Sequence, residues 1–197
     1  GPDVIRSVTG EEITHEDLGG ADAHARRSGV AHFAIDGERE TLDEVRRLLS
    51  FLPSNNAEDA PLIAGLEPSE TETEEISNVI PDEPNRPYDV REIVYRLVDN
   101  GDFMEVHESY APNIVVGFAR IEGSSVGFVC NQPKQLAGVL DTEGSRKAAR
   151  FVRFCDCFNI PLITLVDIPG YLPGSGQEHN GIITHGAKLL FAYSEAT

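Results

Sequence analysis

The chain has 197 residues, of which 40% are hydrophobic and 25% are charged, a composition typical of a folded globular protein. Its 33 acidic residues exceed its 16 basic ones and give a formal net charge of −17, which argues against nucleic-acid binding because that function needs a basic surface. No apolar run is long enough to span a bilayer, and the start of the chain lacks the basic and apolar regions of a signal peptide. These features predict a cytoplasmic protein without a membrane partner.

The acidity and the cysteines each leave two interpretations open. The negative charge favours either simple solubility or adaptation to high salt, where self-repulsion is screened. The three cysteines are predicted to be reduced and mostly packed rather than metal ligands. Their number is odd, and Cys155 and Cys157 are spaced so that they do not share a helix face.

The first third of the chain contains one clear helix signal. Apolar residues recur at helical spacing from Leu42 to Leu49, and Thr41 with Glu44 fits a capping box. This pattern predicts a helix that begins at Thr41 and ends before Pro53. Earlier in the chain, residues 11–12 are expected at an exposed helix start and residues 17–20 in a turn.

A stretch from about residue 57 to residue 87 is rich in acids and prolines and poor in apolar residues. This composition predicts a solvated linker, with an acidic interaction segment as the alternative. Its acids and prolines are Glu67, Glu70, Glu72, Glu74, Glu75, Asp82, Glu83, Pro68, Pro81, Pro84 and Pro87.

Beyond the linker, strand and helix signals alternate, which predicts an α/β fold. Asp89 is expected to be the N-cap of the first helix, and residues 122–124 are expected to form a hairpin turn. The expected helices are 90–98, 147–154 within the segment 141–158, and one that starts near 181; the expected strands are 103–107, 114–121, 125–130 and 162–167. The last strand is a continuous apolar run, which predicts burial on both of its faces.

The loop after this last strand is the main candidate for chemistry. In α/β sheets, ligands bind beyond the carboxyl ends of strands. Pro169 stiffens the loop, whereas Gly170 and Gly174 allow the backbone to approach a ligand closely. The backbone N–H groups of Gly181 and Ile182, at the following helix start, are suited to stabilise an oxyanion. A loop that only turns the chain is the alternative.

Long stretches of the sequence resemble the carboxyltransferase (beta) subunits of biotin-dependent acyl-CoA carboxylases, which include propionyl-CoA and acetyl-CoA carboxylases and methylmalonyl-CoA carboxyltransferase. The likeness covers nearly the whole chain and is weakest in the acidic linker. It is carried by residues 1–11, 18–29, 113–120, 131–133 and 149–197, the last including Gln177-Glu178 and His185-Gly186-Ala187-Lys188.

The resemblance implies an α/β fold of the crotonase-like (ClpP/crotonase) type, a β-β-α superhelix, with parts of two such domains in this chain. Residues 1–84 would be the C-terminal end of the N-terminal domain plus the acidic linker, and residues 85–197 the first part of the C-terminal domain. The family transfers CO2 from carboxybiotin, carried on a separate protein or subunit, to the α-carbon of a short acyl-CoA such as propionyl-CoA or acetyl-CoA. Two pairs of backbone amides hold the oxyanions, and the resemblance implies no metal at this site.

The implied partners are a biotin carboxylase, a biotin carboxyl carrier subunit and further copies of the chain, in a hexamer of beta subunits. By the same likeness, Gly181 and Ile182 would be catalytic amide donors. The biotin-facing loop would contain Asp167, Pro169, Gly170, Gly174 and Gln177, and the acyl-CoA region would contain Asn113, Gly117, Asn131 and Gln132.

Four single residues keep two interpretations each. His185 is expected to make a structural hydrogen bond rather than act as a base, and Lys188 to meet either a phosphate or a helix end. Because the chain as a whole would repel an anion, contacts to coenzyme A phosphates must come from local bases and backbone amides. Arg150 and Arg153 share a helix face and are expected to pair with carboxylates, with contact to a coenzyme A phosphate as the alternative.

Two departures from the family pattern limit the resemblance. The glycine-rich segment of the N-terminal domain would lie before Gly1 and a Tyr-Gly-Gly segment would lie after Thr197, so residues 1–197 alone are expected to be inactive and cut from a longer chain. Thr184 also stands where the family usually has Arg. The alternative function is a non-catalytic fragment or paralogue that serves in assembly as a scaffold. A crotonase-type hydratase ranks below both, because only Glu178 lies in the loop where a Glu pair is needed.

Overall fold

The computed structural model describes residues 1–64, 73–83 and 86–197. Part of the expected acidic linker therefore lies outside the described residues, including Glu67, Pro68, Glu70, Glu72 and Pro84, as does the expected domain boundary at residues 84–85. Within the described part of this stretch, a short helix, α4, spans Thr73–Ser77.

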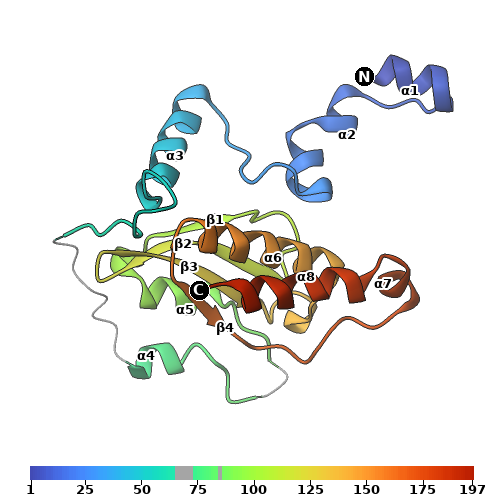
Figure 1. Ribbon diagram of the computed structural model, residues 1–197. Helices are drawn as coiled ribbons and strands as arrows, with labels where there is room; N and C mark the ends of the chain where they lie inside the picture. Colours follow the sequence, from blue (N-terminus) through green and yellow to red (C-terminus); the bar gives the residue numbers. More distant parts are fainter. Residues whose placement is uncertain (65–72, 84–85) are drawn as a thin grey trace.

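A four-stranded sheet forms the centre of the molecule, with its strands in the order β1-β2-β3-β4 (Figure 1). These strands are Phe103–Val106, Ile114–Ile121, Ser124–Asn131 and Leu162–Leu165. The first three pair antiparallel, and β3 pairs parallel with β4. The expected hairpin is confirmed: Glu122 and Gly123 both have positive φ, as a type I′ turn requires, and the Asp99 carboxylate accepts both of their N–H groups.

Helices cover both faces of this sheet. On one face lie α6 (Thr142–Cys157) and α8 (Ile182–Glu195), and on the other lies α5 (Arg91–Leu97). Alternation along β2 explains the two cores, because Val116 and Phe118 pack toward α6 while Val115 and Ala119 pack toward α5. The mixed α/β architecture predicted from the sequence is confirmed.

The last strand, β4, was expected to be buried on both faces, and this expectation was wrong. All four residues of β4 are half-buried or exposed to solvent, whereas seven of eight residues are buried in each of β2 and β3. The reason is position: among the described strands, β4 lies at the edge of the sheet and pairs only with β3. An apolar run shows that a strand can be buried, but its neighbours decide whether it is.

The helices predicted within residues 86–197 are confirmed, but their first residues differ from those predicted. The helix signal at 147–154 lies within α6, which begins at Thr142 because the Asp141 carboxylate caps it by accepting the Gly144 N–H at 2.7 Å. The N-cap of α5 is Val90 rather than Asp89, although Asp89 accepts the Arg91 N–H at 3.1 Å. Two 3-10 turns, η2 (Asp99–Gly101) and η3 (Leu136–Gly138), complete this part.

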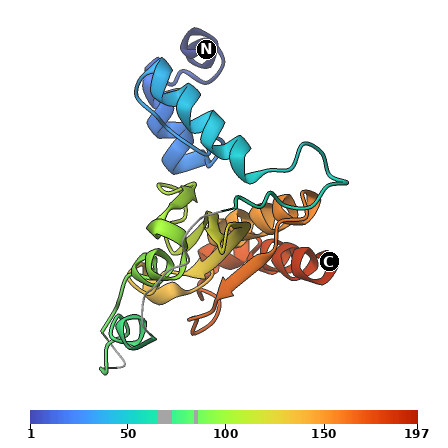
Figure 2. The same ribbon diagram turned by 90° about the vertical axis from the view of Figure 1, so that its left-hand side faces the viewer.

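The N-terminal segment extends away from the sheet (Figures 1 and 2). It contains α1 (Pro2–Thr9), α2 (His15–Gly19) and a π-helix, η1 (Ala23–Ser28). Two expectations here were wrong. Residues 17–20 do not form a turn, because Thr14 caps α2 by accepting the Asp17 N–H, and residues 11–12 lie in the connection after α1 rather than at a helix start.

The helix α3 (Glu38–Phe51) confirms the amphipathic signal and corrects its start. Thr41 is not an N-cap, because the helix begins after Gly37 and the Thr41 hydroxyl donates to the Gly37 carbonyl. The end before Pro53 is confirmed. Phe51 is fully buried against the sheet, and the Arg120 guanidinium lies 4.1 Å from its ring centroid and donates to the Ser50 carbonyl, so α3 is anchored at its C-terminal end.

None of the helices in the described part of the chain is long and apolar enough to cross a membrane.

Candidate functional site at the carboxyl ends of β3 and β4

Because β3 and β4 are parallel, their carboxyl ends meet at one edge of the sheet. Two loops leave from this edge, residues 132–141 after β3 and residues 166–174 after β4. They bind each other through their backbones, since the Leu140 N–H donates to the Gly170 carbonyl at 3.1 Å and the Leu172 N–H donates to the Leu140 carbonyl at 2.8 Å. The starts of α6, α8 and the short helix α7 (Ser175–His179) follow these loops. The edge expected from the sequence therefore exists, and two loops rather than one build it.

Asp167 and Asn131 hold the two loops together. The Asp167 N–H donates to Asn131 Oδ1 at 3.3 Å, and Asn131 Nδ2 donates to the Gly138 carbonyl at 2.8 Å. The Asp167 carboxylate accepts the Tyr88 hydroxyl at 2.8 Å. Burial raises the pKa of Tyr88, and the hydrogen bond to the Asp167 carboxylate raises it further, so this phenol stays protonated. Asn131 and Tyr88 therefore hold Asp167, and with it the start of the loop after β4, in place.

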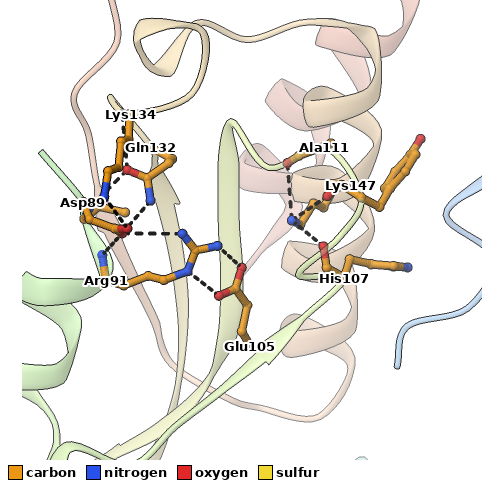
Figure 3. Close-up of polar contacts among 10 residues, drawn as sticks. Asp89, Arg91, Glu105, His107, Ala111, Gln132, Lys134 and Lys147 are labelled. Carbon is orange, nitrogen blue, oxygen red and sulfur yellow. Dashed lines mark hydrogen bonds and ion pairs between the residues drawn. The ribbon is translucent and has the colours of Figure 1, made fainter. Parts of the chain in front are cut away.

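Gln132 is fully buried and belongs to a charged network beside the loop (Figure 3). Its Nε2 donates to Asp89 Oδ1 at 2.7 Å, and its Oε1 accepts the Val90 N–H at 3.3 Å. Arg91 bonds both oxygens of Glu105, at 2.6 and 2.8 Å. Burial alone would raise the pKa of Asp89, but hydrogen bonds from Gln132 and from the Arg91 backbone, with nearby cations, lower it overall. The network orders the start of the loop after β3.

Asn113 joins this edge, whereas Gly117 does not. Asn113 is buried, and its Nδ2 donates to the Val139 carbonyl at 2.9 Å and to Asp141 Oδ1 at 3.1 Å. Gly117 lies within β2, where a Cβ would come within 2.4 Å of the Met104 carbonyl oxygen. Gly117 therefore allows β1 to approach β2.

Gln177, on α7, ties the biotin-facing candidate loop to the start of α6. Its Oε1 accepts the Thr142 N–H at 2.9 Å and the Thr142 hydroxyl at 3.0 Å. Pro169, Gly170 and Gly174 lie between Asp167 and this contact. A Cβ built on Gly170 or Gly174 would meet nothing within 4 Å, so the backbone there is open to an approaching group.

The two candidate amide donors differ in their hydrogen bonding. The Gly181 N–H donates to the Glu178 carbonyl at 3.0 Å, which occupies it in this conformation. Ile182 is the first residue of α8, and among the described residues its N–H makes no backbone hydrogen bond outside the helix. The first four N–H groups of a helix have no partner within it, so the Ile182 amide is free to bind an anion.

A family profile described as the carboxyl transferase domain matches residues 1–197 of this chain. The chain belongs to the carboxyl transferase domain family. It is 56% identical over 197 residues to the propionyl-CoA carboxylase carboxyltransferase subunit of Haloferax mediterranei, with 100% of this chain and 38% of that one covered. It is 55% identical over 197 residues to the methylmalonyl-CoA decarboxylase subunit alpha of Veillonella parvula, covering 100% of this chain and 39% of that subunit.

A solved structure supports the same assignment. The crystal structure of transcarboxylase 12S with methylmalonyl-CoA and methylmalonic acid bound superposes with a TM-score of 0.97 at 50% identity, covering 100% of this chain and 38% of that one. The predicted crotonase-like fold class is therefore confirmed. This carboxyl transferase domain chain spans less than two fifths of the length of these relatives.

Sequence reasoning missed a buried lysine in this carboxyl transferase domain chain. Lys147 is 2% exposed, and its Nζ donates to the carbonyls of His107, Tyr110 and Ala111 at 2.9, 2.8 and 3.3 Å (Figure 3). Its burial could have been predicted from its spacing, because Lys147 lies four residues before Phe151 and so shares the apolar face of α6.

The basic residues singled out from the sequence have few partners. His185 Nδ1 and Lys188 Nζ lie 3.3 Å apart, and Arg153 lies 3.8 Å from the Glu195 carboxylate.

Thr184 is exposed on the first turn of α8. Within the described residues, no group of three or more His, Cys, Asp or Glu side chains is arranged to hold a metal ion.

Proposed function

We propose that this chain carries one wall of the carboxyltransferase site of an acyl-CoA carboxylase, which moves CO2 from carboxybiotin to the α-carbon of a short acyl-CoA. The observation that carries the proposal is the match of all 197 residues to the carboxyl transferase domain, including the loops at the carboxyl ends of β3 and β4. Relatives named for propionyl-CoA and methylmalonyl-CoA support a short acyl chain.

The residues of the loop after β4 fit the approach of a biotin ring. Gly170 and Gly174 leave open space beside the backbone, and the N–H of Ile182, with that of Gly181 once it leaves Glu178, would stabilise negative charge. Biotin, attached to a carrier protein, would supply the carboxyl group. Asp167 and Gln177 would position the loop through their contacts to Asn131 and Thr142.

The residues that hold the loop after β3 would serve the acyl-CoA side. Asn113, Asn131 and Gln132 have their amide nitrogens bonded within the chain, so their role would be to hold the loop rather than to touch the substrate. Gly117 would act through strand packing. Residues 1–84 would belong to one crotonase-like domain with its linker, and residues 85–197 to a second.

The partners form a further part of the proposal. The carboxyl group would come from a biotin carboxylase with a biotin carboxyl carrier subunit, and the chain would act in a hexamer of beta subunits in the cytoplasm. Transcarboxylase 12S, which superposes on this chain, is described as a hexamer assembly.

A chimaera tests the function. Residues 1–197 would replace the matching segment of the Haloferax mediterranei subunit, and the product would be supplied with that enzyme's biotin-carrying partner. We expect carboxylation of acetyl-CoA or propionyl-CoA in preference to longer acyl-CoAs. The isolated chain serves as the comparison and is expected to be inactive.

The same experiment tests the alternative, a non-catalytic scaffold. A chimaera that assembles with its partner but does not carboxylate any acyl-CoA, while the parent subunit does, would refute the catalytic proposal. Turnover by residues 1–197 alone would instead refute the expectation that the flanking segments are needed.

A further inference from the structure

A basic cleft lies between α6, α8 and residues 28–30 of the N-terminal segment, with a volume of about 620 Å³. Five basic residues line it, namely Arg146, Lys147, Arg150, Arg153 and Lys188, together with one acid, Glu195. Five of the 16 bases and one of the 33 acids of the chain thus meet at one cleft, against the overall charge of −17. Solubility does not explain this local reversal of charge.

Arg146 pairs with Glu143 at 3.2 Å and Lys147 donates to three backbone carbonyls, but the other three basic residues of the cleft are poorly compensated. Among the described residues, the exposed Arg150 guanidinium makes no ion pair or hydrogen bond. Arg153 meets Glu195 at 3.8 Å with both side chains more than 60% exposed, a kind of pair that contributes little. Lys188 Nζ contacts the ring of His185, which brings no negative charge.

The pKa values of two nearby histidines are lowered, in part by the positive charges of these residues. Burial lowers the pKa of His32, and the charge of Arg150 lowers it further. Burial and the charges of Lys188 and Arg146 likewise lower the pKa of His185, although that residue is only partly buried. Both effects agree with an excess of positive charge along α6 and α8.

We propose that this cleft binds a phosphorylated small molecule, with Arg150 and Arg153 on α6 and Lys188 on α8 as the residues that hold its phosphate oxygens. A guanidinium offers paired N–H donors that match two oxygens of one phosphate, and charge-assisted bonds of this kind are the strong ones. Arg150 and Arg153 are one helical turn apart, so both face the cleft. Repulsion from the rest of the acidic chain is screened over about 8 Å at physiological salt, whereas these cations act at contact distance.

The size and apolar rim of the cleft favour more than a lone phosphate. Its volume falls in the range of small-molecule sites, roughly 300–1,000 Å³. Phe191 and Val30 line it with 64% and 63% of their surfaces exposed, so they can cover a ring or alkyl portion. Two sources share this chemistry, a free polyphosphate anion and the nucleotide part of a coenzyme A ester. The proposal does not depend on carboxyl transfer.

Direct titration tests the site without any enzyme assay. Calorimetry at fixed ionic strength, in a phosphate-free buffer, would measure the Kd of inorganic pyrophosphate and of 3′,5′-ADP for the protein. We expect Arg150→Gln and Arg153→Gln each to raise the Kd about tenfold or more. Glu195→Gln should lower the Kd, because it removes the carboxylate that competes for Arg153.

Arg39→Gln is the matched control, because it removes the same charge from a side chain that is 91% exposed on α3. Its Kd should stay within twofold of that of the unmodified protein. Tighter binding of 3′,5′-ADP than of pyrophosphate, with the same dependence on Arg150, identifies a nucleotide ligand, and equal binding identifies a free polyphosphate. The proposal is overturned if neither probe binds at millimolar concentration or if Arg39→Gln weakens binding as much as Arg150→Gln.

Discussion

Lys147 is buried, yet its amino group has a complete set of partners. An ammonium group has three N–H donors, and three backbone carbonyls of residues 107–111 accept them. Burial lowers the pKa of Lys147 to about 7. The side chain therefore closes the loop between β1 and β2 onto α6 at some electrostatic cost.

We expect Lys147→Met to destabilise the fold by about 2–4 kcal/mol, because three carbonyls lose their common donor while the new side chain fills a similar volume. Urea unfolding followed by circular dichroism measures this free energy. Lys134→Met, at a side chain that is 59% exposed, is the control and should stay within about 0.5 kcal/mol. Equal stability of both variants would contradict the structural role assigned to Lys147.

At the scale of single elements, Gln177 connects two helix starts. Its carboxamide oxygen is the acceptor for both donors of Thr142, which is 4% exposed at the first position of α6. The oxygen therefore satisfies one of the N–H groups that every helix start leaves without an internal partner. It also holds α7 against α6 and so sets the end of the loop after β4.

Gln177→Ala should release this loop. We expect backbone amide exchange in residues 166–181 to accelerate about fivefold to tenfold, corresponding to a lost hydrogen bond of about 1 kcal/mol, with little change in global stability. Hydrogen exchange followed by mass spectrometry measures it. Gln177→Glu keeps an acceptor at the start of α6 and should retain the protection, whereas protection that survives in Gln177→Ala would show that the loop is ordered by its backbone contacts to Leu140 alone.

The elements differ in how well the sequence predicts them. The hairpin of β2 and β3 and the helix α8 follow directly from local patterns, because alternation, turn residues and helical period all agree there. The burial of β4 could not be read in this way, since it depends on its position at the sheet edge. The short helices α1 and α2 carry no buried residue, and each is too short for its apolar positions to establish a helical period.

The position of the loop that forms the candidate site could be predicted from the sequence, but the hydrogen bonds within the site could not. The apolar strand followed by a Gly/Pro-rich loop located the carboxyl end of β4. The bond from the Gly181 N–H to Glu178 depends on α7, a five-residue helix in a loop expected to be irregular. The pairing of Asn131 with Asp167 joins residues 36 positions apart, a contact that no local pattern specifies.

At the scale of the whole molecule, His107 joins the N-terminal segment to the end of β1. His107 Nε2 donates to the Gly29 carbonyl at 2.9 Å, and the His107 N–H donates to the His32 carbonyl at 3.0 Å. Gly29 has φ +62 and lies against Tyr110, where a Cβ would come within 2.7 Å of the ring. Both the imidazole and the glycine are therefore needed for this close approach.

The protonation state of His107 should control how firmly the segment is held. Burial lowers the pKa of His107 to about 4, and the neighbouring His32, Lys147 and Arg150 oppose a further positive charge there. The bond to Gly29 acts in the opposite direction but is weaker. Because the unfolded chain takes up this proton near pH 6.5 and the folded one only near pH 4, the stability contributed by neutral His107 is complete above pH 6.5 and is lost as the pH falls toward 4.

We expect the free energy of unfolding to fall by about 1–2 kcal/mol more between pH 7 and pH 4.5 in the unmodified protein than in His107→Gln, which keeps a donor for Gly29 but does not titrate. Urea unfolding at a series of pH values measures the difference. The pKa of His32 is also lowered, so His32→Gln should remove a further part of the slope and the double variant should remove both. Limited proteolysis should cut residues 24–35 faster at pH 5 than at pH 7 in the unmodified protein only. If His107→Gln shows the full pH dependence, the acid sensitivity arises from carboxylates elsewhere, and His107 acts through its shape rather than its charge.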